Sequence, residues 1–250
     1  MKVGFIGAGN MARAIARGWG EPVLCSDGGS GRAAALAAEL GGRAASNVEV
    51  AQESDLVVLC HKPYQLKDVA AEIKPHAKAV ASVLGSTTAH ELNWAYAPAP
   101  VFRLMPNTPV EIRQGIVCYS RFEGVDPEVE AQVLELFGRL GSVITLPERL
   151  LGPATAIMGV GPAYQALVAE AQIDAAVRRG LTPALAGRLV VETMAGSASL
   201  LAARDYDTLT VRREVTSPGG STARGLDALE RAGVRSAFSD AMEAVEGPPR

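Results

Sequence analysis

The chain has 250 residues, of which 48% are hydrophobic and 20% are charged, with a formal net charge of −3. This length allows one large domain or two smaller ones, each able to bury its own core. The small net charge without a long basic run argues against a nucleic-acid or membrane-surface partner, and no apolar run of bilayer-spanning length is expected.

The first predicted element is a strand, a tight turn and a helix start within the segment Lys2–Ile15. Gly7 permits the turn, Gly9 lets a pyrophosphate approach the backbone, and Ala12 completes a GxGxxA pattern. The acidic residue Asp27 follows 20 positions after Gly7, as in dinucleotide-binding βαβ units. Free N–H groups and the positive end of the helix dipole would face the anion. The stretch therefore predicts a dinucleotide site, with an ordinary glycine-containing βα turn as the alternative.

The first half of the chain then alternates strand and helix signals. Helices are expected at Arg32–Leu40, Pro63–Ile73 and Pro127–Leu140. Further strands are expected at Pro22–Ser26, Leu56–Cys60, Ala79–Leu84, Val101–Met105, Ile116–Ser120 and Val143–Leu146. Repeated βα units of this kind predict an α/β Rossmann-type doubly wound, mostly parallel sheet over residues 1–147. Its ligands should bind outside the carboxyl ends of the strands.

After Pro147 the strand signals end, and residues 148–250 are predicted to form an all-helical domain. Helices are expected at Pro162–Arg179, Pro183–Ala203, Thr222–Ala232 and Arg235–Val245. So much Ala, Gly and Leu in about a hundred residues of helix leaves more apolar surface than one small bundle hides. We therefore predict burial against a second copy of the chain. A self-contained bundle packed on the first domain is the alternative.

The three cysteines, Cys25, Cys60 and Cys118, lie in apolar runs without paired spacing. An odd number in this setting suits neither a disulfide framework nor a metal cluster, so reduced thiols are expected. The three histidines also lack metal-ligand spacing, and no metal site is predicted. With no signal-peptide pattern at the N-terminus, these features predict a cytoplasmic protein.

The segment TSPGGST (Thr216–Thr222) is the most chemically suggestive part of the second half. Pro218 fixes a turn, and Gly219 and Gly220 offer uncovered backbone N–H groups. Ser221 and Thr222 place hydroxyls in the first turn of the following helix. This combination favours a cradle for a carboxylate with a hydroxyl beside it. A proline-glycine turn with helix-capping Ser and Thr is the alternative.

Five motifs in one order carry a resemblance to a known family. They are GFIGAGNMA at 4–12, HKP at 61–63, RLMPNTP at 103–109, GVGPAY at 159–164 and TSPGGST at 216–222. Together they cover nearly the whole chain and resemble pyrroline-5-carboxylate reductase. MPNTP and SPGGST are far more specific than the glycine turn.

The resemblance implies reduction of the cyclic imine 1-pyrroline-5-carboxylate to L-proline by NAD(P)H, in a homodimer or a larger assembly of dimers. It places the substrate carboxylate at SPGGST and makes Thr222 the catalytic residue, through a hydrogen bond to the ring nitrogen. The substrate-binding residues predicted are Ser217, Gly219, Gly220, Ser221 and Thr222. The cofactor-binding residues predicted are Gly7, Gly9, Asn10, Met11, Ser26, Asp27, His61, Lys62, Pro63 and Asn107.

The choice between the two cofactors depends on the end of the second strand. Asp27 there can bond the adenosine ribose hydroxyls and would repel a 2′-phosphate, which favours NADH. Ser26, Ser30 and Arg32 could instead surround a phosphate. Because the resemblance favours NADPH, we expect NADP(H), with NAD(H) as the alternative.

Three departures from the family pattern leave other functions open. Met158 and Val160 stand where the family has serines. Reduction of a related cyclic imine acid and a non-catalytic, dinucleotide-binding regulatory role are therefore alternatives. His61 stands where an apolar residue is commoner, and it either lines the cofactor pocket or packs at a strand end. A hydroxyacid dehydrogenase of similar architecture would need a lysine in its helical domain, and this chain has none after Lys78.

Overall fold

The computed structural model describes residues 1–122 and 124–247, so the last three residues of the predicted second domain lie outside it. The chain divides into two compact units, Met1–Pro162 and Ala163–Arg250. Division of the chain at residue 147 into two functional domains stays a prediction.

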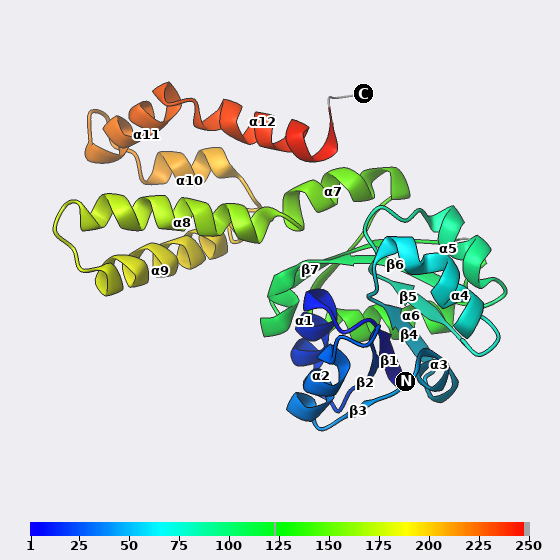
Figure 1. Ribbon diagram of the computed structural model, residues 1–250. Coiled ribbons are helices and arrows are strands. Elements are labelled where there is room, and N and C mark those ends of the chain that lie inside the picture. The colour runs from blue at the N-terminus through cyan, green and yellow to red at the C-terminus, as the bar shows by residue number, and fades with distance from the viewer. Residues whose placement is uncertain (123, 248–250) are drawn as a thin grey trace. The chain divides into compact units, whose positions relative to one another are not determined.

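The first unit contains one eight-stranded sheet with the strand order β3-β2-β1-β4-β5-β6-β7-β8 (Figure 1). All neighbouring strands run parallel except β6 and β7, which are antiparallel. The strands are β1 (Val3–Ile6), β2 (Leu24–Ser26), β3 (Arg43–Ala44), β4 (Leu56–Leu59), β5 (Val80–Ser82), β6 (Val101–Pro106), β7 (Gly115–Ser120) and β8 (Gly141–Thr145). The predicted doubly wound, mostly parallel sheet is confirmed.

Helices cover both faces of this sheet. They are α1 (Asn10–Trp19), α2 (Arg32–Leu40), α3 (Asn47–Glu53), α4 (Leu66–Ile73), α5 (Ala89–Tyr96) and α6 (Pro127–Gly138). Short 3₁₀ turns at Pro63–Gln65, Thr108–Ile112 and Glu148–Leu150, and helix α7 (Leu151–Met158), complete the unit. The predicted helix from Pro63 is therefore a 3₁₀ turn followed by α4.

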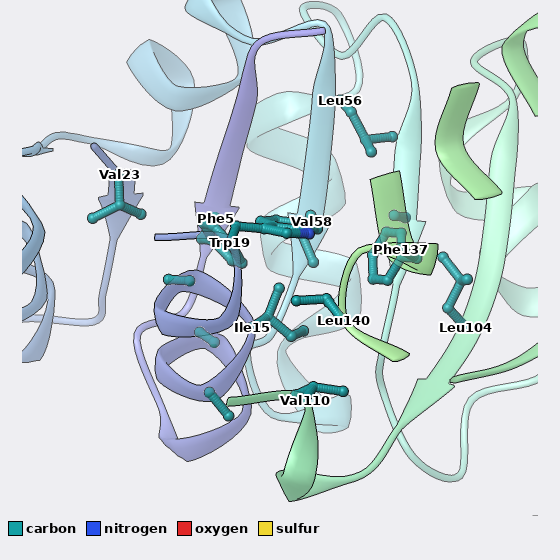
Figure 2. Close-up of a cluster of buried hydrophobic side chains, with 14 of the residues drawn as sticks. Phe5, Ile15, Trp19, Val23, Leu56, Val58, Leu104, Val110, Phe137 and Leu140 are labelled. Carbon is teal, nitrogen blue, oxygen red and sulfur yellow. The ribbon is translucent and has the colours of Figure 1, made fainter. Parts of the chain in front are cut away.

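The alternation of side chains along each strand supplies two cores. In β1, Phe5 joins the cluster beneath α1, α2 and α6, whereas its neighbour Ile6 joins the cluster beneath α3, α4 and α5. Figure 2 shows the first cluster, where Trp19 of α1 lies between Phe5 and Phe137. The Trp19 ring centroid is 5.6 Å from that of Phe5 and 5.4 Å from that of Phe137. Aromatic pairs at this spacing anchor α1, and with it the glycine turn that precedes it, to the sheet.

The carboxylate of Glu130 in α6 is buried beside the end of β7. Glu130 is 5% exposed, accepts a hydrogen bond from Tyr119 Oη at 2.8 Å and accepts another from Arg121 Nε at 2.9 Å. The hydrogen bonds from Arg121 hold the pKa of Glu130 below its ordinary value of 4.5. Since the folded pKa lies below the unfolded one, this contribution to stability is complete above about pH 4.5 and is lost as the pH falls.

We expect Glu130→Gln to lower the free energy of unfolding by about 1–3 kcal/mol at pH 7. The amide keeps the shape of the side chain but removes the negative charge that accepts the hydrogen bonds from Tyr119 and Arg121. The difference from the natural protein should shrink as the pH falls below 4.5, as measured by denaturant titrations at both pH values. Glu135→Gln, an exposed change on the same helix, is the matched control. An equal loss of stability for Glu130→Gln at both pH values would contradict the role of the ionised carboxylate.

In the described part of the second unit, residues 163–247, the regular elements are helices. They are α8 (Gly161–Val177, whose first two residues precede the unit boundary), α9 (Pro183–Ala202), α10 (Thr208–Glu214), α11 (Ser221–Arg231) and α12 (Val234–Glu246). The four predicted helices are confirmed within a few residues, whereas α10 was not predicted.

This unit has almost no buried core of its own. Ala169 in α8 and Ala186 in α9 are the buried residues of its described helices. Large apolar side chains stay exposed, among them Leu185 (46%), Leu189 (50%) and Phe238 (49%). Helix α9 is also long and apolar enough to cross a membrane by length and composition, so the expectation that no such segment exists was wrong. An apolar helix that packs against another subunit has the same length and composition.

Candidate active site

The chain order places a topological switch point between β1 and β4. From β1 the chain moves outward through β2 to β3, then returns to β4 on the other side of β1. The loops that follow β1 and β4 therefore diverge and leave a crevice at the carboxyl edge of the sheet. A hollow of about 170 Å³ lies there, lined by the loops after β1, β2 and β4 and by side chains of α2, α3 and α4. We call it the switch-point crevice.

Two glycines of the β1 turn have different physical roles. Gly7 has a φ of +97°, and a Cβ at this position would lie 2.6 Å from backbone atoms of Cys60 and His61. The missing side chain thus lets the β4 loop pack directly on the turn. Gly9 has an ordinary φ of −76°, and a Cβ there would have no atom within 4 Å. Gly9 therefore keeps the approach to the start of α1 open.

The start of α1 offers its N–H groups to a ligand. Gly9 is the N-cap residue, and no side chain caps the helix. Asn10 is exposed and Met11 is half-buried at the edge of the core beneath α1, so both predicted residues lie in the first turn of α1. An uncapped helix N-terminus with open space in front of it fits a pyrophosphate.

Asp27 is oriented toward its own loop. Its Oδ1 accepts the Gly29 N–H at 2.9 Å, while Oδ2 accepts the Ser30 hydroxyl at 2.8 Å and the Ala33 N–H at 3.0 Å. These hydrogen bonds, with that from Ala33 largest, lower the pKa of Asp27. The carboxylate thus stabilises the turn and the start of α2, and Ser30 and Arg32 line the crevice beside it.

Ser26 is almost completely buried and does not line the crevice. Its hydroxyl donates to Asn47 Oδ1 at 2.6 Å, and Asn47 Nδ2 in turn donates to Glu72 at 2.7 Å. Asn47 itself lines the crevice. Contact of Ser26 with the cofactor stays a prediction, and its observed role is to orient Asn47.

The loop after β4 brings His61 and Lys62 to the crevice, whereas Pro63 is exposed and lies outside its lining. Gln65, in the turn that follows, also lines it and accepts the Lys62 N–H at 3.0 Å. The crevice thus unites the predicted Gly7, Gly9, Asp27, His61 and Lys62.

Sequence reasoning missed Asn47 and Gln65 and did not include Ser30 and Arg32 among the predicted cofactor residues. The signal for Asn47 was the capping box formed by Ser46 and Glu49, which marks the start of α3.

Asn107 is nearly buried and joins three elements. Its Nδ2 donates to the Met158 carbonyl at 3.1 Å, and its Oδ1 accepts the Ile116 N–H at 2.8 Å. Met158 packs in a small core with Met105, Cys118 and Leu151. Asn107 therefore holds α7 against β7, and a contact between its side chain and the cofactor stays a prediction. Met158 is a packing residue, which accounts for its apolar character.

The predicted substrate segment opens helix α11. Gly219 has a φ of +69°, and a Cβ at Gly220 would lie 2.4 Å from Ser217 Oγ. The left-handed φ makes glycine the favoured residue at 219, whereas a side chain at 220 would need the exposed Ser217 hydroxyl to rotate away. Gly220 is the N-cap residue and no side chain caps α11, which leaves the first-turn N–H groups available for an anion. Thr222 is half-buried, while Ser217 and Ser221 are exposed.

A larger hollow of about 770 Å³ is lined by residues of α4 and α5, including the exposed Trp94. None of its lining residues belongs to a loop at the carboxyl edge of the sheet. The smaller switch-point crevice is the candidate cofactor site, because the glycine turn and an uncapped helix start lie there.

A doubly wound sheet with an open glycine turn at its switch point is the arrangement of a dinucleotide-binding protein. Residues 2–88 match the family described as NADP oxidoreductase coenzyme F420-dependent, and residues 148–247 match pyrroline-5-carboxylate reductase dimerisation. Pyrroline-5-carboxylate reductase of Pseudomonas aeruginosa is 32% identical over 98% of this chain and 94% of its own length. The chain belongs to the pyrroline-5-carboxylate reductase family.

Solved structures agree with this assignment. The crystal structure of Plasmodium falciparum pyrroline carboxylate reductase with NADP bound has a TM-score of 0.87 at 29% identity, covering 98% of this chain and 95% of that one. The Streptococcus pyogenes 1-pyrroline-5-carboxylate reductase has a TM-score of 0.87 at 30% identity and covers 99% of both chains. The resemblance drawn from the sequence motifs is thus confirmed.

Proposed function

We propose that this protein reduces 1-pyrroline-5-carboxylate to L-proline with NADPH, the last step of proline biosynthesis. The observation that carries the proposal is the uncapped start of α11 within TSPGGST, in a chain that belongs to this family over its full length. Free amides beside a threonine hydroxyl match a small ring that carries a carboxylate next to a nitrogen.

The helical unit would hold the substrate through its α11 start. The N–H groups of Ser221 and Thr222 would bind the carboxylate, while the Gly220 N–H donates to the Ser217 carbonyl at 3.0 Å and so helps to form the turn around it. The Thr222 hydroxyl would bond the ring nitrogen and hold the imine in one orientation. A hydroxyl is too weak an acid to protonate the imine by itself, so its role is to position the ring and to relay a proton from water.

The switch-point crevice would hold the dinucleotide, which when bound supplies the hydride. Three observations fit such a ligand: the open space at Gly9, the uncapped start of α1 and an unpartnered buried nitrogen of His61. Because the Asp27 carboxylate accepts from its own loop and the Ser30 hydroxyl donates to that carboxylate, Arg32 is the group left to meet the adenosine ribose. This arrangement favours the 2′-phosphate of NADPH over the bare ribose of NADH.

The direct test is the loss of NADPH absorbance when 1-pyrroline-5-carboxylate is added to the purified protein. We expect turnover with both cofactors and a higher kcat/KM for NADPH. Replacing Arg32 by Ala should raise the KM for NADPH and leave that for NADH nearly unchanged. Tight NADPH binding without turnover on this or a six-membered cyclic imine acid would favour a regulatory protein instead.

We also propose that the second unit forms a homodimer, or a larger assembly of dimers, through its exposed apolar helices. The match of residues 148–247 to a dimerisation domain supports association, and so does the nearly coreless helical unit. Burial in such an interface explains the composition of α9 without a membrane. We also propose a cytoplasmic location, which suits the free thiols of Cys25, Cys60 and Cys118.

Leu189 on α9 provides a test of this association. Leu189→Ala should raise the dimer dissociation constant roughly 30- to 900-fold, because both subunits lose a large side chain that becomes buried, at about 1–2 kcal/mol each. Sedimentation equilibrium over a dilution series measures the constant. The control is Leu134→Ala in the first unit, which should change stability but not association. An unchanged dissociation constant for Leu189→Ala would exclude this face of α9 from the interface.

A further inference from the structure

The imidazole of His61 has a defined tautomer. Its Nδ1 lies 2.8 Å from the Lys62 carbonyl oxygen. A carbonyl oxygen can only accept a hydrogen bond, so Nδ1 must carry the proton and donate it. In the neutral ring Nε2 is then the unprotonated nitrogen, which is an acceptor.

This acceptor has no partner. Nε2 of His61 is buried and makes no hydrogen bond with the part of the chain that the structure describes. Leaving a buried polar atom unpaired is costly, and such atoms in folded proteins usually await a water or a ligand. The same side chain lines the switch-point crevice, and its backbone packs against the turn at Gly7. The side chain that carries the unpaired acceptor therefore borders the crevice where the dinucleotide is proposed to bind.

The chemistry of the dinucleotide limits what can meet this nitrogen. Its phosphate oxygens are acceptors at neutral pH and would repel the lone pair of Nε2. Its donors are the ribose hydroxyls, the adenine amino group and the carboxamide, and of these the ribose hydroxyls lie nearest to the pyrophosphate that the glycine turn of the same crevice would hold. We propose that His61 Nε2 accepts a hydrogen bond from a ribose hydroxyl of the bound dinucleotide, so that His61 binds and orients the cofactor through a fixed tautomer. This inference rests on the proposed function, since the dinucleotide is the ligand of the crevice.

The surroundings of the ring are consistent with a neutral imidazole. Burial lowers the pKa of His61, against a smaller opposing effect of the hydrogen bond to the Lys62 carbonyl. The charged groups that line the same crevice are Asp27, Arg32 and Lys62, with the Cys60 thiol beside them. The Asp27 carboxylate is ionised but is held by the N–H groups of its own loop, whereas the two positive charges disfavour protonation of the ring.

The tautomer can be observed directly in the full-length protein labelled with ¹⁵N-histidine. The chain has three histidines, so His61→Gln assigns the His61 signals by their disappearance. Without ligand, the His61 signals should show a protonated Nδ1 and an unprotonated Nε2. Saturating NADP⁺ should shift Nε2 in the direction of hydrogen bonding and leave the tautomer unchanged. An unchanged Nε2 signal, with NADP⁺ binding verified by calorimetry on the same sample, would overturn the inference.

Affinity measurements separate this inference from the proposed function. His61→Val should raise the Kd for NADP⁺ about tenfold, the loss expected for one buried hydrogen bond. His90→Val, an exposed change, should leave the Kd unchanged. The ratio of the Kd values of His61→Val and the natural protein should approach one as the pH falls, because protonated Nε2 can no longer accept.

A ratio that grows on acidification would show that His61 meets a phosphate instead and would overturn the assignment. If the natural protein failed to bind NADP⁺ at all, the proposed function would fall, which is a separate result from a bound cofactor that leaves His61 unaffected.

Discussion

Replacing Gly7 by Ala should lower the stability of the protein by disrupting the packing of the β4 loop on the glycine turn, whereas the same change at Gly9 should leave the stability unchanged. The Cβ added at Gly7 would lie 2.6 Å from the Cys60 carbonyl carbon and oxygen and from the His61 nitrogen, at a φ of +97°. Backbone atoms of a β4 loop held by the sheet cannot give way as a flexible side chain can. We expect a loss of about 2–4 kcal/mol in the free energy of unfolding, from strain and overpacking together.

Gly9→Ala is the matched control for this experiment. Its φ of −76° suits an L-residue, and the added Cβ meets no atom within 4 Å. The free energy of unfolding should therefore stay within about 0.5 kcal/mol of the natural value. The methyl group would instead occupy the space in which a pyrophosphate approaches α1, so the Kd for NADPH should rise at least about tenfold. Denaturant titration and quenching of NADPH fluorescence separate the two effects. A stable Gly7→Ala protein with natural affinity would contradict the packing argument.

Thr222→Val should reduce kcat/KM for 1-pyrroline-5-carboxylate by about 5- to 150-fold, which corresponds to about 1–3 kcal/mol of lost transition-state stabilisation. Valine keeps the shape of threonine and removes only the hydroxyl. The position is half-buried at the start of α11, so the change should leave stability nearly unaffected. Steady-state kinetics at saturating NADPH measure the effect.

Two further variants make the Thr222 experiment specific. Thr222→Ser retains a hydroxyl and should recover most of the activity lost in Thr222→Val. Ser221→Ala removes the neighbouring, exposed hydroxyl and tests whether any hydroxyl in the turn would serve. If Thr222→Val kept the natural kcat/KM, the ring nitrogen would have to be held by another group.

The sequence predicted the strands of the sheet well because parallel strands buried on both faces are short apolar runs. Leu56–Leu59, for example, is buried at every position. It did not predict β3, since Arg43 and Ala44 are both exposed and pair with β2 only at the edge of the sheet. A two-residue edge strand has no periodicity to detect.

Two missed helices did carry a signal. Helix α3 begins with the capping box of Ser46 and Glu49, and α5 begins with that of Thr88 and Glu91. Both have a Ser or Thr followed three residues later by Glu, a pattern that marks a helix start even where the apolar stripe is short. The more prominent strand signals on either side concealed these short helices.

Within the site, the glycine pattern identified the crevice, but the direction of each side chain needed the structure. Asp27 illustrates the limit, because an acidic residue at this place can meet a ribose or stabilise its own loop. The sequence DGGS favours the second outcome, since an Asp commonly accepts the N–H two residues on, as it does here from Gly29. The structure shows the carboxylate occupied by that loop and leaves Ser30 and Arg32 facing the crevice.

The helical unit has one consequence for how the enzyme must be handled. Its two buried alanines cannot offset the conformational entropy of some eighty ordered residues. If the apolar faces of α8 and α9 are buried against a second copy of the chain, dissociation of the subunits and unfolding of these helices occur together. Activity would then disappear on dilution at the rate of an unfolding reaction, and recovery on concentration would be as slow as folding. The lifetime of a dilute sample, more than its Tm, would be the property that the interface determines.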